Sequence, residues 1–144
     1  MLSKAHATWE GDLLKGSGRT SLASGAAKEL AVSWPSRTEA PSGKTSPEEL
    51  IAAAHASCYC MALSHGLAGA GHPPTKLEAD AVATFAKTDA GFRITKMALS
   101  VRGQVPGMDE DAFKKAAEAA KEGCPVSQAL KGNVEITLEA SLAQ

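Results

Sequence analysis

The pattern of apolar and polar residues divides the chain into short strands before and after one long apolar helix. The first forty residues contain glycines and serines at short intervals, which is typical of strands joined by tight turns. Further along, apolar and polar residues alternate with the period of two that predicts a half-buried strand. The predicted strands are Ala5–Glu10, Gly18–Ala23, Leu30–Trp34, Lys76–Ala86, Phe92–Val105 and Val134–Leu142. Thr88–Gly91 is the predicted hairpin turn, and Pro35–Lys44 is a predicted polar loop.

The long helix has a clear predicted start. Ser46 can cap its N-terminus, Pro47 suits the first helical position, and Glu49 has the spacing that completes a capping box with Ser46. The helix is predicted to run from Pro47 to about Ala68, where glycines follow. Its many alanines favour helix and allow other elements to approach closely.

Two further helices are predicted in the second half of the chain. Asp109–Glu122 is amphipathic and is followed by Gly123, a residue that commonly ends helices. Its apolar face is formed by Phe113, Ala116, Ala117 and Ala120. Pro125 can start a short helix that reaches Leu130. The order β-β-β-α-β-β-α-(short α)-β predicts an α+β fold of antiparallel sheets and a long central helix, as a single domain over residues 1–144.

The apolar character of the central helix bears on assembly. Polar residues interrupt the stretch Leu50–Ala70, so a buried helix is expected there in preference to a membrane span. Apolar residues occupy most of its circumference, whereas one small sheet covers only one side of a helix. A second copy of the chain could cover the rest, which favours a homodimer.

Composition narrows the functional classes. A length of 144 residues suits one domain with a real core, and a net charge of -1 gives no support to nucleic-acid or membrane-surface binding. The N-terminal residues lack the continuous apolar region of a secretory signal. Three cysteines in such a chain are expected to be reduced thiols in a cytoplasm, available for packing, metal or redox chemistry.

The cysteines differ in their predicted surroundings. Cys58 and Cys60 point about 160° apart on the helix, so they cannot share a site within one chain. Taken alone, a cysteine in a helix such as Cys58 is more often a small buried packing residue. Cys124 is predicted at the N-cap of the short helix, where the dipole and free N–H groups would lower the pKa of its thiol. By this argument alone Cys124 would be the nucleophile, with an inconsequential N-cap cysteine as the alternative.

Charged residues near the helix start are candidates for an activating group. A reactive cysteine needs a cation that stabilises its thiolate, and Arg37 in the polar loop or Arg19 in the first hairpin could supply it. Glu48 could hold the guanidinium fork, because Glu49 already serves the predicted capping box. Ten helical residues separate Glu48 from Cys58, about 15 Å along the axis. A site containing both therefore needs a sharp bend or a second subunit.

The histidines give weaker signals. His55 lies three residues before Cys58 and could pair with that thiol, although a core histidine with a backbone partner is the expected role. His6, His65 and His72 lack the spacing of metal ligands, so no metal site is expected.

Two blocks of this sequence resemble the OsmC/Ohr family (osmotically inducible protein C and organic hydroperoxide resistance), and in particular its OsmC branch. One block is TSPEELIAAAHASCYCMALS, residues Thr45–Ser64, which is similar to the family's helix start and first catalytic cysteine. The other is GCPVSQALKGNVEITLEASL, beginning at Gly123, which carries the second cysteine. The family's opening hairpin is similar to HATWEGDLLKGSGRTSLASG in this chain. A later hairpin of the family is similar to TDAGF followed by RITKMAL.

The resemblance implies an intertwined homodimer that reduces peroxides, organic ones preferentially, to the alcohol and water. It implies that Cys58 is oxidised to a sulfenic acid and that Cys124 resolves it as an intramolecular disulfide. It makes Arg37 and Glu48 the activating pair, since Arg37 matches the loop arginine of the OsmC branch. Arg19, within GSGRTS, does not align with the hairpin arginine of the Ohr branch.

The expected site is therefore composite, with Cys58 and Cys124 from one chain and Glu48 and Arg37 from the other. No bound cofactor is expected, because sulfur carries the redox change and an external dithiol or lipoyl-type reductant regenerates the thiols. Cys60 is assigned to packing. The alternative is a redox-sensing or small-molecule binding protein on the same fold, favoured if Cys58 and Cys124 are too far apart to bridge. A metal-binding module is a third possibility.

Overall fold

The computed structural model describes residues 1–40 and 42–143. The chain divides into two compact units, Met1–Leu50 and Ile51–Gln144, and each is described by itself. The assignment of residues 1–144 to a single domain stays a prediction.

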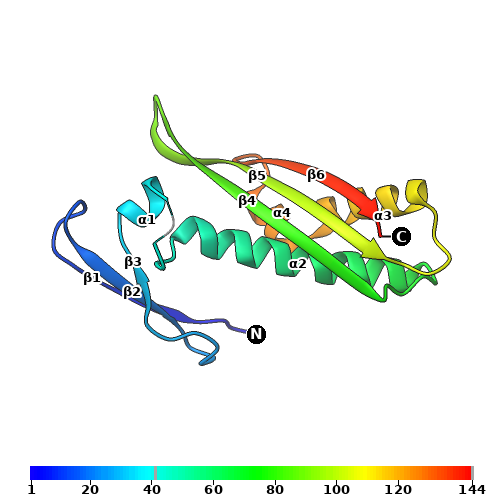
Figure 1. Cartoon of the computed structure of the whole chain (residues 1–144), viewed down its shortest axis with the longest axis horizontal. Helices are drawn as coiled ribbons and strands as arrows, with labels where there is room; N and C mark the ends of the chain where they lie inside the picture. Colours follow the sequence, from blue (N-terminus) through cyan, green and yellow to red (C-terminus); the bar gives the residue numbers. More distant parts are fainter. Residues whose placement is uncertain (41, 144) are drawn as a thin grey trace. The chain divides into compact units, whose positions relative to one another are not determined.

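The first unit contains a three-stranded antiparallel sheet, shown in blue to cyan in Figure 1. Its strands, in the order β1-β2-β3, are β1 (Ala5–Glu10), β2 (Ser17–Leu22) and β3 (Leu30–Val32). The first strand has the predicted bounds, and the second is shifted by one residue. β3 ends before Trp34, and the predicted polar loop contains a short helix, α1 (Pro35–Thr38).

The early end of β3 has a local cause. Ser33 and Ser36 bond reciprocally, because the Ser33 N–H donates to Ser36 Oγ at 3.1 Å and the Ser36 N–H donates to Ser33 Oγ at 3.2 Å. Such side-chain to backbone bonds compete with a strand ladder. Pro35 lies between the two serines and is well suited to open a helix.

The long helix, α2 (Pro47–Gly69), begins where the sequence predicts. Ser46 Oγ accepts the Glu49 N–H at 3.1 Å, as in a capping box. The predicted return bond is replaced, because the Glu49 carboxylate accepts the Thr45 hydroxyl at 2.6 Å instead. Only the serine half of the predicted capping box is therefore present.

One face of α2 is completely buried in the second unit. Its members recur every fourth residue, which places them in one line on a helix: His55, Tyr59, Leu63 and Leu67. We call this line the core stripe of α2.

The rest of α2 is more exposed than the buried helix predicted from sequence. Met61 is 67% exposed, and Ala54 is exposed as well. By length and composition α2 could cross a membrane, but the core helices of soluble proteins meet the same criterion. In its most apolar 18-residue stretch, 22% is buried within the chain. The single chain therefore leaves an apolar helical face uncovered.

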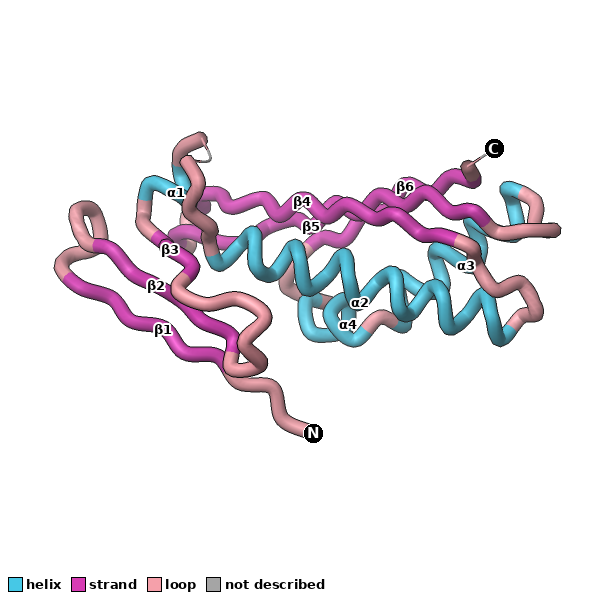
Figure 2. The backbone as a smooth tube through the Cα atoms, turned by 60° about the horizontal axis from the view of Figure 1, so that its bottom comes forward, coloured by secondary structure: helices cyan, strands magenta, loops and turns pink. Residues whose placement is uncertain are grey.

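The second unit also contains a three-stranded sheet, in the order β4-β5-β6. Its strands are β4 (Lys76–Thr88), β5 (Gly91–Gln104) and β6 (Glu135–Leu142). β4 and β5 form the predicted antiparallel hairpin, whereas β6 pairs parallel to β5, which the prediction of antiparallel sheets did not include. The reason is the crossover formed by α3 (Glu110–Gly123) and α4 (Pro125–Leu130), which returns the chain to the starting end of β5. In Figure 2, α2, α3 and α4 cover one face of this sheet.

Helix α3 packs on the sheet through the predicted apolar face. Asp109 caps its N-terminus by accepting the Ala112 N–H at 2.8 Å. Phe113, Ala117 and Ala120 are buried. The Phe113 ring lies over Gly103 of β5, where an added Cβ would be 2.6 Å from two ring carbons. The absence of a side chain at Gly103 is thus a condition of this helix–sheet contact.

We expect Gly103→Ala to lower the free energy of unfolding by about 1–3 kcal/mol, because the new methyl group overpacks against Phe113. Urea denaturation followed by circular dichroism measures this change. Gly69→Ala is the control, since an added Cβ at Gly69 has no heavy atom within 4 Å. Equal stability of the two variants would contradict the proposed packing constraint.

Candidate active site

Two of the three cysteines lie together in the second unit. Cys58 is half-buried on α2, and Cys124 is completely buried at the junction of α3 and α4. The Cys58 thiol is within hydrogen-bond reach of the Cys124 thiol and of the Val126 backbone N–H. Both thiols are free. Residues 66 positions apart in the sequence thus form one cluster of two sulfurs and an amide.

Three influences act on the acidity of Cys58. Burial, the largest, raises the pKa of the Cys58 thiol above its ordinary value. The Val126 N–H lowers the pKa because it donates to the sulfur and favours the thiolate, whereas the neighbouring Cys124 raises it. The net direction is upward. A cation that approaches Cys58 would therefore increase the fraction of reactive thiolate.

Cys124 occupies the N-cap of α4, as predicted from the sequence. Its side chain, however, makes no capping hydrogen bond. The first free N–H of α4, at Val126, is directed to Cys58. The helix N-terminus therefore favours the thiolate of Cys58, and the sequence argument that pointed to Cys124 as the nucleophile assigned this amide to the wrong sulfur.

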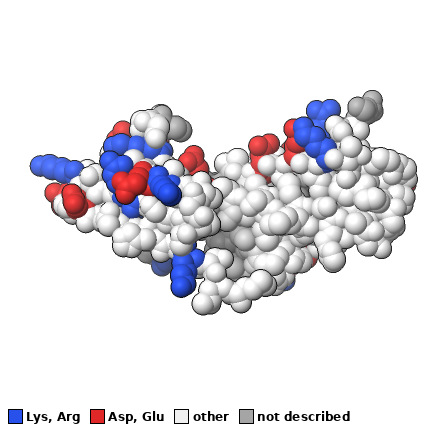
Figure 3. Space-filling view, turned by 90° about the horizontal axis from the view of Figure 1, so that it is seen from below, with Lys and Arg blue, Asp and Glu red and all other residues white. Residues whose placement is uncertain are grey.

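Cys58 borders an apolar groove of about 750 Å³, which we call the Cys58 groove. It lies between one side of α2 and the residues of α3 and the α3–α4 junction. Its lining consists of Cys58, Met61, Ala62, His65, Gly66, Ala70, Ala116, Ala119, Ala120, Gly123 and Pro125. This described lining has no lysine or arginine. In the right-hand part of Figure 3 the charged side chains lie along the upper edge, and the broad surface below them is uncharged.

The first unit holds a strong ion pair between Arg37 of α1 and Glu48 of α2. Arg37 Nη2 donates to Glu48 Oε1 at 2.6 Å, and Nε donates to the two carboxylate oxygens at 3.1 and 3.2 Å. The Arg37 guanidinium also lies 5.6 Å from the ring centre of Trp34. The side chains are 29% and 7% exposed, so the pair is far better shielded than an ordinary surface ion pair. The structure thus brings together the two residues that the sequence analysis paired.

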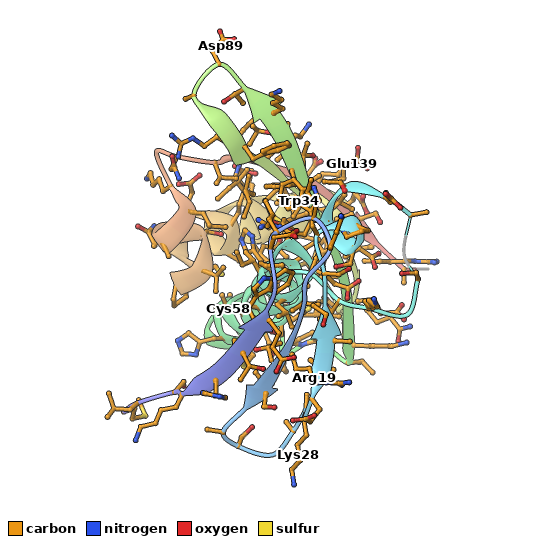
Figure 4. All side chains as sticks on the ribbon, turned by 90° about the vertical axis from the view of Figure 1, so that its left-hand side faces the viewer. Arg19, Lys28, Trp34, Cys58, Asp89 and Glu139 are labelled. Atoms are coloured by element: carbon orange, nitrogen blue, oxygen red, sulfur yellow. The ribbon has the colours of Figure 1, made fainter. Side chains whose placement is uncertain are left out.

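Arg19, the competing arginine, has a different environment. It lies on β2 with its Nε 3.7 Å from Glu29 Oε2, and the two side chains are 58% and 72% exposed. Figure 4 shows Arg19 well separated from Trp34, the residue that Arg37 contacts. Its guanidinium is held by this solvated carboxylate and by a long hydrogen bond to the Glu29 carbonyl at 3.4 Å, so Arg37 is the better-oriented cation.

His55 is a core residue, but its partner differs from the predicted backbone group. Its Nε2 lies 2.7 Å from Oγ of Ser127 in α4, and both residues are buried. Burial lowers the pKa of His55, which favours the neutral ring. His55 belongs to the core stripe, so it does not pair with Cys58 as the alternative interpretation allowed.

The remaining candidates are not brought together with the thiol pair. Cys60 is half-buried, and burial raises the pKa of its thiol. Within residues 1–40 and 42–143, no group of three or more His, Cys, Asp or Glu side chains could hold a metal ion. Glu48 and Cys58 are ten residues apart on α2, about 15 Å of helix rise, so the helix alone does not join them.

Sequence reasoning missed Val126 and Ser127. Pro125 at the first position of α4 makes Val126 the next residue, whose N–H has no partner within the helix. The sequence therefore could have predicted a free N–H at Val126, but it could not show that Cys58 accepts it. Ser127 gave no signal, because its partner lies 72 residues away.

Comparison with known proteins identifies the family. The family model described as "OsmC-like protein" matches residues 40–139. The chain belongs to the OsmC/Ohr family. It is 47% identical over 139 residues to Peroxiredoxin OsmC of Escherichia coli (strain K12), covering 96% of this chain and 95% of that protein. It is 30% identical over 140 residues to the organic hydroperoxide resistance protein of Xanthomonas axonopodis pv. citri (strain 306), covering 96% and 94%.

Solved structures of OsmC/Ohr proteins share the fold. The organic hydroperoxide resistance protein OhrB of Bacillus subtilis superposes with a TM-score of 0.75 at 26% identity, covering 96% of this chain and 98% of that one. An organic hydroperoxide resistance protein from Elizabethkingia anophelis superposes with a TM-score of 0.78 at 25% identity, covering 99% of each chain. The predicted α+β fold of the OsmC/Ohr type is therefore confirmed.

We expect Cys124→Ala to lower the pKa of Cys58, because the neighbouring Cys124 raises it. The pH dependence of Cys58 alkylation by iodoacetamide, followed by mass spectrometry of the modified peptide, should shift to lower pH. Cys60→Ala is the control and should leave the profile unchanged. A midpoint for Cys124→Ala at or above that of the unmodified chain would contradict the assigned influence.

Proposed function

We propose that this chain is a cysteine-based peroxidase that reduces organic hydroperoxides, and hydrogen peroxide more weakly, to the alcohol and water. One observation carries the proposal: the Cys58 thiol lies close enough to a second thiol, Cys124, and to the Val126 N–H for both to change its pKa. A nucleophile beside a resolving thiol is the arrangement that two-step thiol redox chemistry requires. The names of the relatives, a peroxiredoxin and organic hydroperoxide resistance proteins, support the same activity.

The reaction follows from the two thiols. The Cys58 thiolate attacks one peroxide oxygen, so that an S–O bond forms, the O–O bond breaks and the leaving alkoxide takes a proton to become the alcohol. The Cys124 sulfur then attacks the Cys58 sulfur, an S–S bond forms, and the sulfenic oxygen leaves as water. An external dithiol reduces the disulfide and is itself oxidised to a disulfide. Sulfur carries both electrons, so no bound cofactor is proposed.

The Cys58 groove supports an organic substrate. It opens at the nucleophile, and its lining is mainly alanine, glycine and methionine. Burial of an alkyl or aryl group against such a surface is favourable by about 25 cal/mol per Å² of apolar area. Hydrogen peroxide has no apolar group to bury and gains nothing from the groove.

The Arg37–Glu48 pair is proposed as the activating cation, supplied by a partner subunit. Cys58 needs a positive charge because burial raises the pKa of its thiol, and the described lining of the Cys58 groove offers no lysine or arginine. Glu48 holds the Arg37 guanidinium in a fixed orientation through three hydrogen bonds, which suits a cation that stabilises a thiolate or polarises a peroxide oxygen. The uncovered apolar face of α2, including Met61, supports a homodimer in which this pair reaches the other chain's cysteines.

A redox-sensing or small-molecule binding protein on the same fold is the alternative from another class. It would be favoured if the two thiols were too distant to bridge, whereas here Cys124 is close enough to change the pKa of Cys58. Turnover with excess peroxide and a dithiol separates the two functions, because a sensor reacts once and an enzyme cycles.

The first experiment compares peroxide consumption by the unmodified chain and by Cys58→Ser, Cys124→Ser and Cys60→Ser. Removal of the nucleophile should lower the rate by about a thousandfold or more. Cys124→Ser should retain one turnover and stop as a sulfenate, and Cys60→Ser should cycle normally. Single-turnover activity in Cys58→Ser would show that another residue attacks the peroxide.

The second experiment tests the activating pair. Arg37→Ala should lower kcat/KM by about 10²–10³, because the thiolate and the transition state lose their cation. Glu48→Gln should lower it less, since the guanidinium remains but is held more loosely. Arg19→Ala is the matched control, an arginine in an exposed ion pair, and should leave kcat/KM unchanged.

The composite site is tested by mixing inactive subunits. In a heterodimer, the Arg37→Ala chain still has Cys58 and the Cys58→Ser chain still has Arg37. If each site combines residues of both chains, one of the two sites therefore has both residues and is intact. Activity should therefore return after the two variants are unfolded and refolded together. Absence of recovery, with heterodimers shown by native mass spectrometry, would mean that Arg37 acts within its own chain.

A further inference from the structure

We propose that the buried hydrogen bond between His55 and Ser127 positions Cys124 for its attack on the oxidised Cys58 sulfur. His55 and Ser127 are then positioning residues, since neither touches the substrate or a reacting sulfur. The inference rests on the peroxidase reaction proposed above, and it concerns the second step, formation of the disulfide.

The His55–Ser127 hydrogen bond is short and is buried away from solvent. His55 Nε2 and Ser127 Oγ are 2.7 Å apart, with the two residues 0% and 3% exposed. A buried polar group that loses its only partner pays the full cost of its desolvation. The bond therefore opposes any movement of α4 away from α2.

The direction of the bond follows from the other ring nitrogen. His55 Nδ1 is buried without a hydrogen-bond partner. A buried N–H without an acceptor is rarer and more costly than an unused lone pair. We therefore assign the proton to Nε2, which donates to Ser127 Oγ. Burial lowers the pKa of His55, in agreement with this neutral ring.

The His55–Ser127 bond and the Cys58–Cys124 pair connect the same two segments, α2 and the start of α4. His55 precedes Cys58 by three residues on α2, and Ser127 follows Cys124 by three residues. Three residues of helix correspond to about 4.5 Å of rise, so the two contacts lie about one helical turn apart. A displacement of Ser127 from His55 is thereby transmitted to Cys124 and to the Val126 N–H.

Cys124 is a pivot that needs such a restraint. It is at once the C-cap of α3 and the N-cap of α4, and its backbone is extended, with φ -62° and ψ 126°. No continuous helix therefore fixes the direction of α4 against α3. Because each residue has two soft backbone dihedrals, rotation at Cys124 could swing α4 and change the direction of the Cys124 side chain. Gln128 donates to the Glu122 carbonyl and Lys131 pairs with Glu122, which ties α4 to α3, whereas the bond from Ser127 ties α4 to α2 and so opposes this rotation.

Disulfide formation is sensitive to this restraint, whereas peroxide attack is less so. An S–S bond requires the two Cβ atoms to lie about 3.5–4.5 Å apart with a defined dihedral angle. A misplacement of about 1 Å can slow a reaction between positioned groups by as much as about a hundredfold. The first step forms no bond to Cys124, and it depends on this segment only through the influence of Cys124 and the Val126 N–H on the pKa of Cys58.

The test separates the two steps in the full-length chain. After one equivalent of cumene hydroperoxide, the Cys58 sulfenate is trapped with dimedone at successive times, and the disulfide is followed by mass spectrometry. We expect Ser127→Ala to form the sulfenate within about threefold of the normal rate and the disulfide at least about tenfold more slowly. His55→Leu should behave in the same way. His55→Gln should recover much of the rate, because its amide nitrogen can donate in place of Nε2.

A matched control excludes general destabilisation. Tyr59→Phe removes another buried bond of the core stripe, from Tyr59 Oη to the Ala117 carbonyl at 3.0 Å, which ties α2 to α3 and not to α4. It should lower the midpoint of thermal unfolding without slowing disulfide formation. Equal slowing in Tyr59→Phe and Ser127→Ala, or a normal rate in Ser127→Ala, would overturn the positioning function.

A second oxidant distinguishes failure of this inference from failure of the proposed function. Diamide adds to one thiol and is displaced by the other, giving the disulfide and the reduced hydrazine without any peroxide. If the unmodified chain does not react with peroxide, the peroxidase proposal fails, and the diamide rates of the same variants still decide the function of the bond. The pair His55→Gln and His55→Leu decides it if Ser127→Ala does not fold.

Discussion

The burial of one line of side chains on α2 is the constraint on which the second unit depends. His55, Tyr59, Leu63 and Leu67 are wholly buried, and apart from His55 they belong to one core cluster with residues of β5 and α3. Two of them also make directed bonds, Tyr59 to α3 and His55 to α4. The rotation of α2 about its axis is therefore fixed by packing and by hydrogen bonds together.

That rotation decides the environment of Cys58. A residue next to a buried line on a helix lies at the boundary between core and surface, and Cys58 is accordingly half-buried. Its sulfur can meet Cys124 and the Val126 N–H on the core side and still border the apolar groove on the other. A nucleophile needs both properties, a defined inner environment and access from outside.

The two halves of the proposed site have opposite electrostatic needs. The thiol pair is partly desolvated and lacks a cation in the described lining of its groove, while the Arg37–Glu48 pair is a shielded cation held in a fixed orientation by a carboxylate. Each half supplies what the other lacks, as the proposed dimeric enzyme requires. In this arrangement assembly would itself activate the thiol, because it would bring a positive charge to a buried sulfur.

Local features of this protein were determined by the sequence alone, because they depend on neighbours a few residues away. Ser46 and Pro47 start α2, Thr88–Gly91 forms the hairpin turn, and Gly123 and Pro125 place Cys124 between two helices. The pairing of Arg37 with Glu48 was also anticipated, over only eleven residues.

Tertiary structure decided what local pattern could not. Because α2 is apolar on most sides, its sequence predicted that one sheet would leave part of it uncovered but did not show which line of residues faces the core. The parallel pairing of β6 with β5 depends on where the α3–α4 crossover returns the chain. The recipient of the Val126 N–H and the partner of His55 lie 68 and 72 residues away, so only the packing of α4 against α2 could select them.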